Sequence, residues 1–411
     1  MPDTFNSTAA DSTASKAALW WPALTLIFIQ VISGFRDMPQ SAFFGIFLHE
    51  RFGLAPASIG NSVAGAQLTG MAAALIASAF ARQLGSKWIL VSGLALLGVS
   101  SLAFQTASPA LAMGLWLASG AGGALLTVGG SSVLTQLSAR GSLGMLSAAY
   151  VFSMTLGGAV GNPIAGVLIV RYGYNVFGWS LIALSAIMTL LAIRFVRDRS
   201  DAPAVAAGPP AQPWRAALSA FQIGRTWLLI PLRSLPTLFY GMLTVLIPLL
   251  LNEYSGNKLL VAAYGTTLLI VASAAQFVAG RVADRHGARL PTQIAYGLIV
   301  VCGIGLAAGA QNTVWLFVFG VLGNATAWAL STLMYVWVAD SVRKTEHAST
   351  FGLLHAVWSV SMIGGSILGG LLVQSQPSLP FLLAGLLNLG SIGLAGAFYG
   401  GLGQKTAQVR V

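Results

Sequence analysis

The stretch Gly34-Phe35-Arg36-Asp37-Met38-Pro39 places two adjacent charges inside an apolar run that reaches from about Leu19 to about Leu48. At about 1.5 Å of rise per residue, this run is roughly 45 Å of helix, which exceeds a hydrocarbon core of about 30 Å. A charge near the bilayer centre costs at least about 2.5 to 3.5 kcal/mol on insertion scales. The sequence therefore predicts a membrane-spanning helix whose charges meet water or a partner.

The polar residues of this run share one stripe of the predicted helix. The residues that recur at i, i+3, i+7 and i+10 are Gln30, Ser33, Asp37 and Gln40, with Arg36 beside them. On one interpretation Arg36, Asp37 and Gln40 line a wet cavity and handle substrate or protons, as buried ionisable residues in membrane helices usually do. On the other, the two charges neutralise each other or bond neighbouring helices and serve structure alone.

The composition is that of a membrane protein. The chain has 411 residues, of which 56% are hydrophobic and 8% are charged, and its mean hydropathy is +0.79. Soluble domains contain about 25% charged residues. The single cysteine, Cys302, excludes a disulfide framework and a multi-cysteine metal site, and we expect no metal and no cofactor.

Twelve apolar segments are long enough to cross a bilayer, since each has about 18 residues or more. Their approximate bounds are 19–48, 56–81, 88–107, 110–137, 143–170, 177–194, 226–251, 259–283, 290–309, 313–339, 350–374 and 379–400. The predicted fold class is an all-α membrane protein with twelve transmembrane helices. An even number of crossings puts both termini on the same side of the membrane.

The distribution of the basic residues predicts on which side of the membrane the termini lie. With the N-terminus inside, sixteen of the 21 Lys and Arg residues fall in cytoplasmic segments; three, Arg51, Arg171 and Lys258, fall outside, and Arg36 and Arg233 lie within helices. This asymmetry predicts cytoplasmic termini by the positive-inside rule. Anionic lipid of the inner leaflet accounts for the net charge of +11, so no nucleic-acid partner is expected.

The chain divides into two related halves. Residues 195–225 are polar and rich in Pro and Ala, and we predict a cytoplasmic linker between bundles 19–194 and 226–400, with tails at 1–18 (disordered) and 401–411. The segment 144–157 aligns with 352–365 at an offset of 208, and Arg36-x-x-Pro39 is echoed by Arg233-x-x-Pro236. Two pseudo-symmetric six-helix bundles imply a cavity between them.

Between the eighth and ninth segments stands the sequence Gly280-Arg281-Val282-Ala283-Asp284-Arg285-His286-Gly287-Ala288-Arg289. It resembles the G-x-x-x-D-R-x-G-x-R loop of the major facilitator superfamily, and with twelve segments in two halves the resemblance covers nearly the whole chain. It implies the fold of these transporters, no enzymatic activity, and a conformational latch. The latch residues would be Gly280, Asp284, Arg285, Gly287 and Arg289, with Asp340 and Arg343 as partners. The alternative for Asp284 is ordinary solvation of a loop. The first half carries Arg82 where the family usually has Asp, so a symmetric latch is not implied.

The fifth segment resembles the antiporter motif G-x-x-x-G-P-x-x-G-G of drug exporters in that family. The matching residues are Gly157, Gly158, Gly161, Asn162, Pro163 and Gly166, with Asn162 where glycine is usual. The resemblance implies export, and generic close packing of helices is the alternative. The fourth segment has no charge between residues 115 and 123, so the exporters' arginine-based proton coupling is not carried over.

The resemblance also implies that segments one, two, four, five, seven, eight, ten and eleven line a central cavity. The further cavity candidates on these segments are Tyr150, Arg233, Tyr240, Asn324, Trp328, Tyr335, His355 and Trp358. The aromatic residues could instead serve packing, Arg233 could snorkel to the surface, and His355 could be a buried hydrogen-bonding group. If Arg36 and Arg233 both face the cavity, it favours an anion. Asp37 and His355 are the candidate proton carriers.

Together these features predict a proton-coupled carrier that moves a small organic solute, anionic or amphipathic, by alternating access. We expect a monomer in a bacterial inner membrane whose partners are the solute, protons and lipid. Export is favoured, as an antiporter, and uptake of a metabolite is the alternative. A membrane-embedded receptor or enzyme on the same scaffold is the rival class, but no catalytic motif is present in the sequence.

Overall fold

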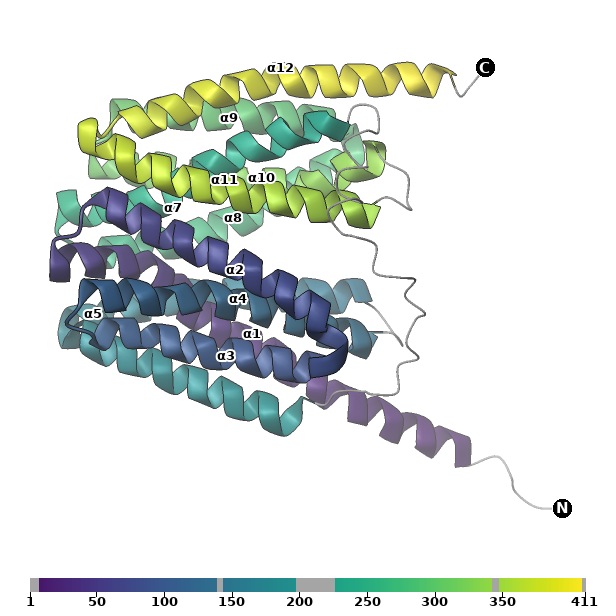
Figure 1. Ribbon diagram of the computed structural model, residues 1–411. Helices are drawn as coiled ribbons and strands as arrows, with labels where there is room; N and C mark the ends of the chain where they lie inside the picture. The colour runs from purple at the N-terminus through teal and green to yellow at the C-terminus, as the bar shows by residue number, and fades with distance from the viewer. Residues whose placement is uncertain (1–6, 139–142, 197–225, 342–346, 409–411) are drawn as a thin grey trace. The chain divides into compact units, whose positions relative to one another are not determined.

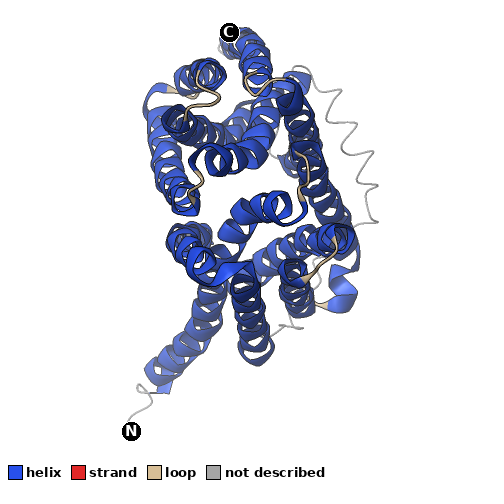
Figure 2. Ribbon diagram, turned by 90° about the vertical axis from the view of Figure 1, so that its left-hand side faces the viewer, coloured by secondary structure: helices blue, strands red, loops and turns tan. Residues whose placement is uncertain are grey.

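A computed structural model describes residues 7–138, 143–196, 226–341 and 347–408. Within these ranges the regular secondary structure is entirely helical, without strands (Figure 2). The helices of the N-terminal half are α1 (Ser7–Phe52), α2 (Pro56–Leu84), α3 (Ser86–Ser101), η1 (Leu102–Gln105), α4 (Pro109–Ser138) and α5 (Leu143–Phe195). Those of the C-terminal half are η2 (Thr226–Leu228), α7 (Leu229–Ser255), α8 (Lys258–His286), α9 (Arg289–Ala308), α10 (Thr313–Ser341), α11 (His347–Ser375) and α12 (Leu379–Gln408).

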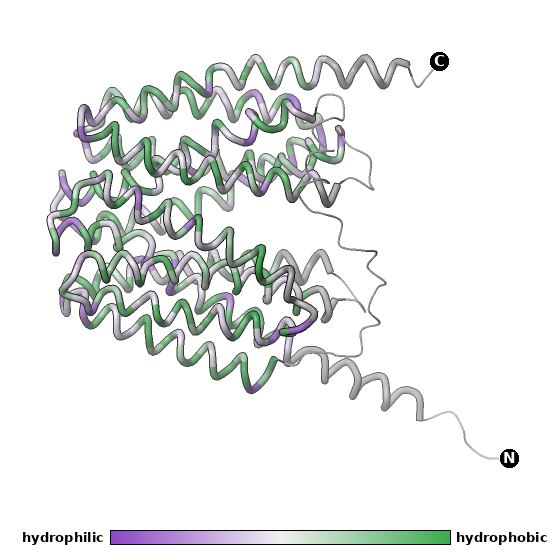
Figure 3. Tube along the Cα trace, viewed as in Figure 1, coloured by the Kyte–Doolittle hydropathy of each residue, from purple (hydrophilic) through white to green (hydrophobic). Residues whose placement is uncertain are grey.

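The predicted apolar segments all lie on these helices, and hydrophobic residues follow their lengths (Figure 3). By length and composition, ten helical stretches in the described part of the chain can cross a membrane. One of them, Ala149–Phe195, has 47 residues and bends at Gly173, whose φ of 81° is a left-handed conformation that glycine adopts without strain. The bend separates the two segments predicted at 143–170 and 177–194. The protein is therefore an integral membrane protein, and the count of twelve crossings stays a prediction.

The predicted tails and linker are only partly described. α1 begins at Ser7 and α12 ends at Gln408, so both helices extend into the segments predicted as tails. The predicted tail 1–18 therefore overlaps the first residues of α1, and its expected disorder stays a prediction. Nearly all of the linker, residues 197–225, lies outside the described ranges, as does Arg343.

The chain divides into two compact units. Unit 1 holds residues 1–40 and 69–203, and unit 2 holds residues 41–68 and 204–411. Residues 41–68 thus pack with the C-terminal helices, although the sequence assigns them to the first bundle. They do so through Glu50, which accepts hydrogen bonds from Lys258 Nζ at 2.9 Å and Asn252 Nδ2 at 3.0 Å.

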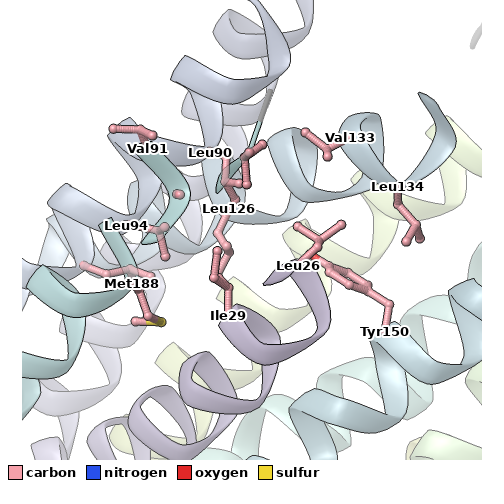
Figure 4. Packing of buried hydrophobic residues seen from close by; sticks show 13 residues of the cluster. Leu26, Ile29, Leu90, Val91, Leu94, Leu126, Val133, Leu134, Tyr150 and Met188 are labelled. Carbon is pink, nitrogen blue, oxygen red and sulfur yellow. The ribbon is translucent and has the colours of Figure 1, made fainter. Parts of the chain in front are cut away.

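Unit 1 has a hydrophobic core between α1, α3, α4 and α5. Figure 4 shows its members, which include Leu26 and Ile29 of α1, Leu90 and Leu94 of α3, and Leu126 of α4. These residues recur at three- and four-residue spacings, so each helix turns one apolar stripe toward the others. In unit 2, α11 lies along α7, α10 along α8, and α12 along α9 (Figure 1).

Glycines bring two pairs of helices into backbone contact. In unit 1, α1 meets α5 at three places, where a Cβ on one residue would collide with the backbone of the other: Gly34 on Met154, Gly157 on Val31, and Gly161 on Phe35. In unit 2, α7 meets α11 at three corresponding places: Gly241 on Met362, Gly365 on Leu238, and Gly369 on Met242. Small residues at such a seam let helices approach closely within a membrane.

These contacts align the two halves. Counterparts on α5 and α11 differ by 208 positions (154 and 362), which agrees with the predicted repeat, and those on α1 and α7 differ by 207 (34 and 241). By this alignment the counterpart of Arg36 is Leu243, and Arg233 lies about ten residues earlier on its helix, or about 15 Å. The predicted echo of Arg36-x-x-Pro39 in Arg233-x-x-Pro236 is therefore wrong, because the glycine contacts and not the short motif determine the register.

A methyl group at the α1–α5 seam is expected to destabilise the protein. In Gly157→Ala the new Cβ would overlap the carbonyl oxygen of Val31, so the helices must separate, at a cost of about 1–3 kcal/mol. The matched control is Gly123→Ala in α4, because no described heavy atom lies within 4 Å of its Cβ position. This control is expected to be neutral or to stabilise by up to about 1 kcal/mol. Thermal melts of the purified variants test the difference, and equal melting temperatures would argue against the seam.

Candidate functional site

A pocket of about 310 Å³ lies within unit 2, between α7, α8, α10 and α11. Its lining residues are Arg233, Pro236, Thr237, Tyr240, Gln276, Ala327, Trp328, Ser331, His355 and Trp358. The structure thus brings together five candidates that the sequence proposes for the cavity: Arg233, Tyr240, Trp328, His355 and Trp358. The four helices are those that the family resemblance implies for this half.

Arg233 supplies the charge of this pocket. It lies four residues after the start of α7, and its Nη1 donates to Ser331 Oγ on α10 at 2.8 Å. Its Nε is buried without a hydrogen-bond partner, and no carboxylate in the described ranges lies within 4 Å of its guanidinium. The guanidinium carries five N–H donors, so it keeps donors for a ligand in the pocket.

Aromatic rings form much of the remaining wall. His355 and Trp358 are three residues apart on α11 and therefore share a face, with ring centroids 5.5 Å apart and planes inclined by 17°. Trp328 of α10 and Tyr240 of α7 also line the pocket. The wall can stack on a planar group, while Arg233 can bind an anion.

Gln276 of α8 is a lining residue that the sequence analysis missed. Its Nε2 lies 3.4 Å from the carbonyl oxygen of Trp328, which it approaches as a donor. The available signal was an amide within the otherwise apolar segment 259–283, where it has no reason to face lipid. No group of three or more His, Cys, Asp or Glu side chains suited to a metal ion occurs among the residues that the structure describes.

Arg36 and Gln40 bind α3 within unit 1 and do not face water. The Arg36 side chain is fully buried and donates to the carbonyl oxygen of Leu97, to Ser101 Oγ at 2.6 Å and to Ser100 Oγ at 3.4 Å. Gln40 Nε2 donates to the same Ser100 Oγ at 3.1 Å. Of the two interpretations, the wet cavity is wrong for these two residues and the bond to a neighbouring helix holds, because oxygens of α3 accept from Arg36 Nη2 and from Gln40. The Arg36 Nε has no partner among the described residues.

The Asp37 side chain is more exposed than that of its neighbour Arg36. Its carboxylate pairs with Arg36 Nη1 and accepts from Ser33 Oγ at 3.2 Å, yet its side chain keeps 20% of its exposure. In this cluster the Arg36 side chain is fully buried, whereas part of the Asp37 side chain is exposed.

Three other cavity candidates lie outside the pocket. Asn324 is buried and donates to the Tyr264 hydroxyl at 2.7 Å and to its own helix, while Tyr335 is 62% exposed and its ring lies 5.2 Å from that of Phe351. Tyr150 belongs to the hydrophobic core of unit 1 (Figure 4). The expectation of a cavity position is corrected for the buried Asn324 and Tyr150, since a stripe on one helix does not show which neighbour it meets, whereas for the exposed Tyr335 it stays a prediction.

The loop between α8 and α9 keeps its predicted turn. Gly287 has a φ of 78° and ends α8, and its counterpart Gly85, between α2 and α3, has a φ of 74°. Asp284, Arg285 and Arg289 are exposed, as is Asp340 at the end of α10. Within the described ranges Asp284 forms no ion pair, so its predicted latch role stays a prediction.

The comparison with protein families decides the identity of the fold. A model of the Major Facilitator Superfamily matches residues 26–310 and 235–406. The chain belongs to the major facilitator superfamily. Members of this superfamily are transporters.

The curated relatives within the superfamily are distant. The class B tetracycline resistance protein of Escherichia coli is 26% identical over 152 residues, and the class D protein of Salmonella ordonez is 28% identical over 159 residues. Each match covers 36% of this chain and 37% or 38% of the relative. The matched part is thus little more than a third of either protein's length.

Solved structures share the superfamily fold over most of the chain. The nucleoside transporter NupG superposes with a TM-score of 0.77 at 14% identity, covering 92% of this chain and 98% of that one. A bacterial homologue of the human lysosomal transporter Spinster gives a TM-score of 0.65 at 15% identity, covering 93% and 96% of the two chains. At these identities the likeness concerns the fold alone.

Proposed function

We propose that this superfamily member is a proton-coupled secondary transporter that moves a small organic solute, anionic or amphipathic, by alternating access. The observation that carries the proposal is the pocket between α7, α8, α10 and α11, with Arg233 as its charged residue and aromatic rings as its wall. Ligand pockets are mostly apolar with a few placed polar groups, and this one fits that description.

Asp37 and His355 are the proposed proton carriers. Asp37 combines a buried helix position with residual solvent exposure, and its partner Arg36 is held by α3. His355 lines the pocket itself, and imidazole is a common proton carrier in proteins. Either group can therefore couple a proton to solute movement.

Export is the favoured direction, and uptake of a metabolite is the alternative. The fifth-segment motif resembles that of exporters, and the distant relatives are named for tetracycline resistance. The superposed structures include a nucleoside transporter, which keeps uptake as the second candidate.

The remaining parts of the proposal are a latch at residues 280–289 with Asp340 and Arg343, a monomeric state, and an inner-membrane location with cytoplasmic termini.

Proteoliposomes with an imposed pH gradient test coupling and direction together. The probes are labelled benzenesulfonate, tetracycline and uridine, each measured against protein-free liposomes. A proton antiporter accumulates solute in an acidic lumen, because protons leave as solute enters, whereas a symporter accumulates it when the outside is acidic. We expect accumulation of an anionic or amphipathic probe in the acidic lumen, abolished by a protonophore. Accumulation of no probe above the protein-free level in either gradient would contradict the proposal.

A further inference from the structure

We propose that the pocket of unit 2 binds a planar aromatic ring that carries one anionic group. This inference rests on the proposed function, since it takes this pocket as the solute site. It adds the shape and charge of the solute, which neither the fold nor the relatives provide.

The anionic group is assigned to Arg233. Its hydrogen bond to Ser331 Oγ uses one of five N–H donors, and its buried Nε has no partner in the described part of the chain. A guanidinium in partly desolvated surroundings without a carboxylate is stabilised by a bound anion through short, charge-assisted hydrogen bonds. Arg233 is also the only Lys, Arg, Asp or Glu on the described lining, so with His355 neutral the pocket neutralises one negative charge and offers no anion to a cationic ligand.

The ring is assigned to the aromatic wall. His355 and Trp358 form a stacked pair, with an interplanar angle of 17°, and Trp328 lines the pocket from α10. Flat faces of this kind favour a planar ligand by about 0.5–1.5 kcal/mol beyond its buried area. An aliphatic ring of similar size fills the same space without stacking.

The pocket is open on one side, so its volume describes the part of a ligand that the lining residues contact. The pocket holds about 310 Å³, at the lower end of the range of about 300–1,000 Å³ for small-molecule sites. A single ring with its acidic group suits this space better than a molecule of several fused rings. The proposed ligand is therefore a small aromatic acid.

Calorimetric titration of the purified full-length protein tests the assignment with three matched probes. Benzenesulfonate has the ring and the charge, benzenesulfonamide has the ring without the charge, and cyclohexanesulfonate has the charge without the planar ring. We expect benzenesulfonate to bind at least about tenfold tighter than benzenesulfonamide and about threefold or more tighter than cyclohexanesulfonate. These comparisons use the wild-type protein, so the folding of a variant does not enter.

Two variants locate the binding in this pocket. Arg233→Gln is expected to remove the preference for the charged probe, and Trp358→Leu the preference for the planar ring. The controls are Arg171→Gln and Trp179→Leu, because both residues are exposed in unit 1, and they should keep both preferences. Equal affinity for benzenesulfonate and benzenesulfonamide, or full charge preference in a folded Arg233→Gln protein, would overturn the inference.

Failure of this inference is distinguishable from failure of the proposed function. If liposomes accumulate tetracycline or uridine in a pH gradient while benzenesulfonate does not bind, the inference fails and the transport function stands. If benzenesulfonate binds in an Arg233-dependent way while no probe crosses the membrane, the ligand assignment stands and the transport function fails.

Discussion

Asp37→Asn protein in liposomes is expected to show no pH-driven solute accumulation above the protein-free level. The carboxylate of Asp37 pairs with the fully buried Arg36 and is 20% exposed, and it is one of the two proposed proton carriers. An asparagine amide keeps the shape and cannot carry a proton at these pH values, but it leaves the buried Arg36 without its anion, so a thermal melt of the variant accompanies the transport measurement. Solute binding at the separate pocket should survive, so the variant should still bind benzenesulfonate as tightly as the wild type.

The control for this variant is Glu253→Gln, which neutralises an exposed carboxylate near the end of α7. It should leave gradient-driven accumulation unchanged. Normal accumulation by Asp37→Asn would remove Asp37 as an essential proton carrier and leave His355 as the remaining candidate.

Arg36→Ala is expected to destabilise the protein more than substitution of Asp37, Arg233 or Glu253. It removes the hydrogen bonds that join α1 to α3 through Leu97, Ser100 and Ser101, and it leaves the Asp37 carboxylate without its cation. Breaking a buried ion pair from one side costs about 3–5 kcal/mol. Thermal melts should therefore show a large drop or a failure to accumulate folded protein.

A milder substitution of Arg36 tests whether this residue serves the stability of the protein or the binding of a ligand. Arg36→Lys keeps the cation without the guanidinium fork, and we expect partial loss of stability with unchanged affinity for benzenesulfonate, because Arg36 does not line the pocket. A selective loss of benzenesulfonate binding in a stable Arg36→Lys protein would show that the sealed position of Arg36 is incorrect.

The helices were predictable from the sequence because each apolar run exceeds the length of a bilayer crossing and is punctuated by glycine, proline and charge. The C-terminal pocket was also largely predictable, since Arg233, Trp328 and Trp358 are polar or amphipathic groups at membrane depth on helices that the family resemblance assigns to a cavity.

The hydrogen-bond partners of Arg36 could not be predicted from the sequence of α1 alone. The insertion cost requires a partner for a buried cation, but it does not say whether that partner is water, a solute or another helix. Here Ser100 and Ser101, adjacent hydroxyls at the end of α3, accept from the guanidinium together with the carbonyl oxygen of Leu97. A pair of serines in an apolar segment was the sequence signal for this contact.

Short sequence motifs also could not predict which residues of α1 correspond to which residues of α7. Arg and Pro at matching spacing suggested one alignment of α1 with α7, whereas the contacts of Gly34 and Gly241 determine another. Backbone contact tolerates only small residues, so the positions of seam glycines carry more information on packing than a polar motif of four residues.

Counterflow of labelled benzenesulfonate tests the central claim most directly. Proteoliposomes are loaded with unlabelled benzenesulfonate and diluted into a trace of the labelled compound without a pH gradient, so that only a carrier that binds and releases the anion on both sides concentrates the label. We predict transient accumulation by the wild-type and Arg171→Gln proteins and none by Arg233→Gln. Wild-type protein that binds benzenesulfonate yet shows no more label than protein-free liposomes would contradict the account of this pocket as a transport site.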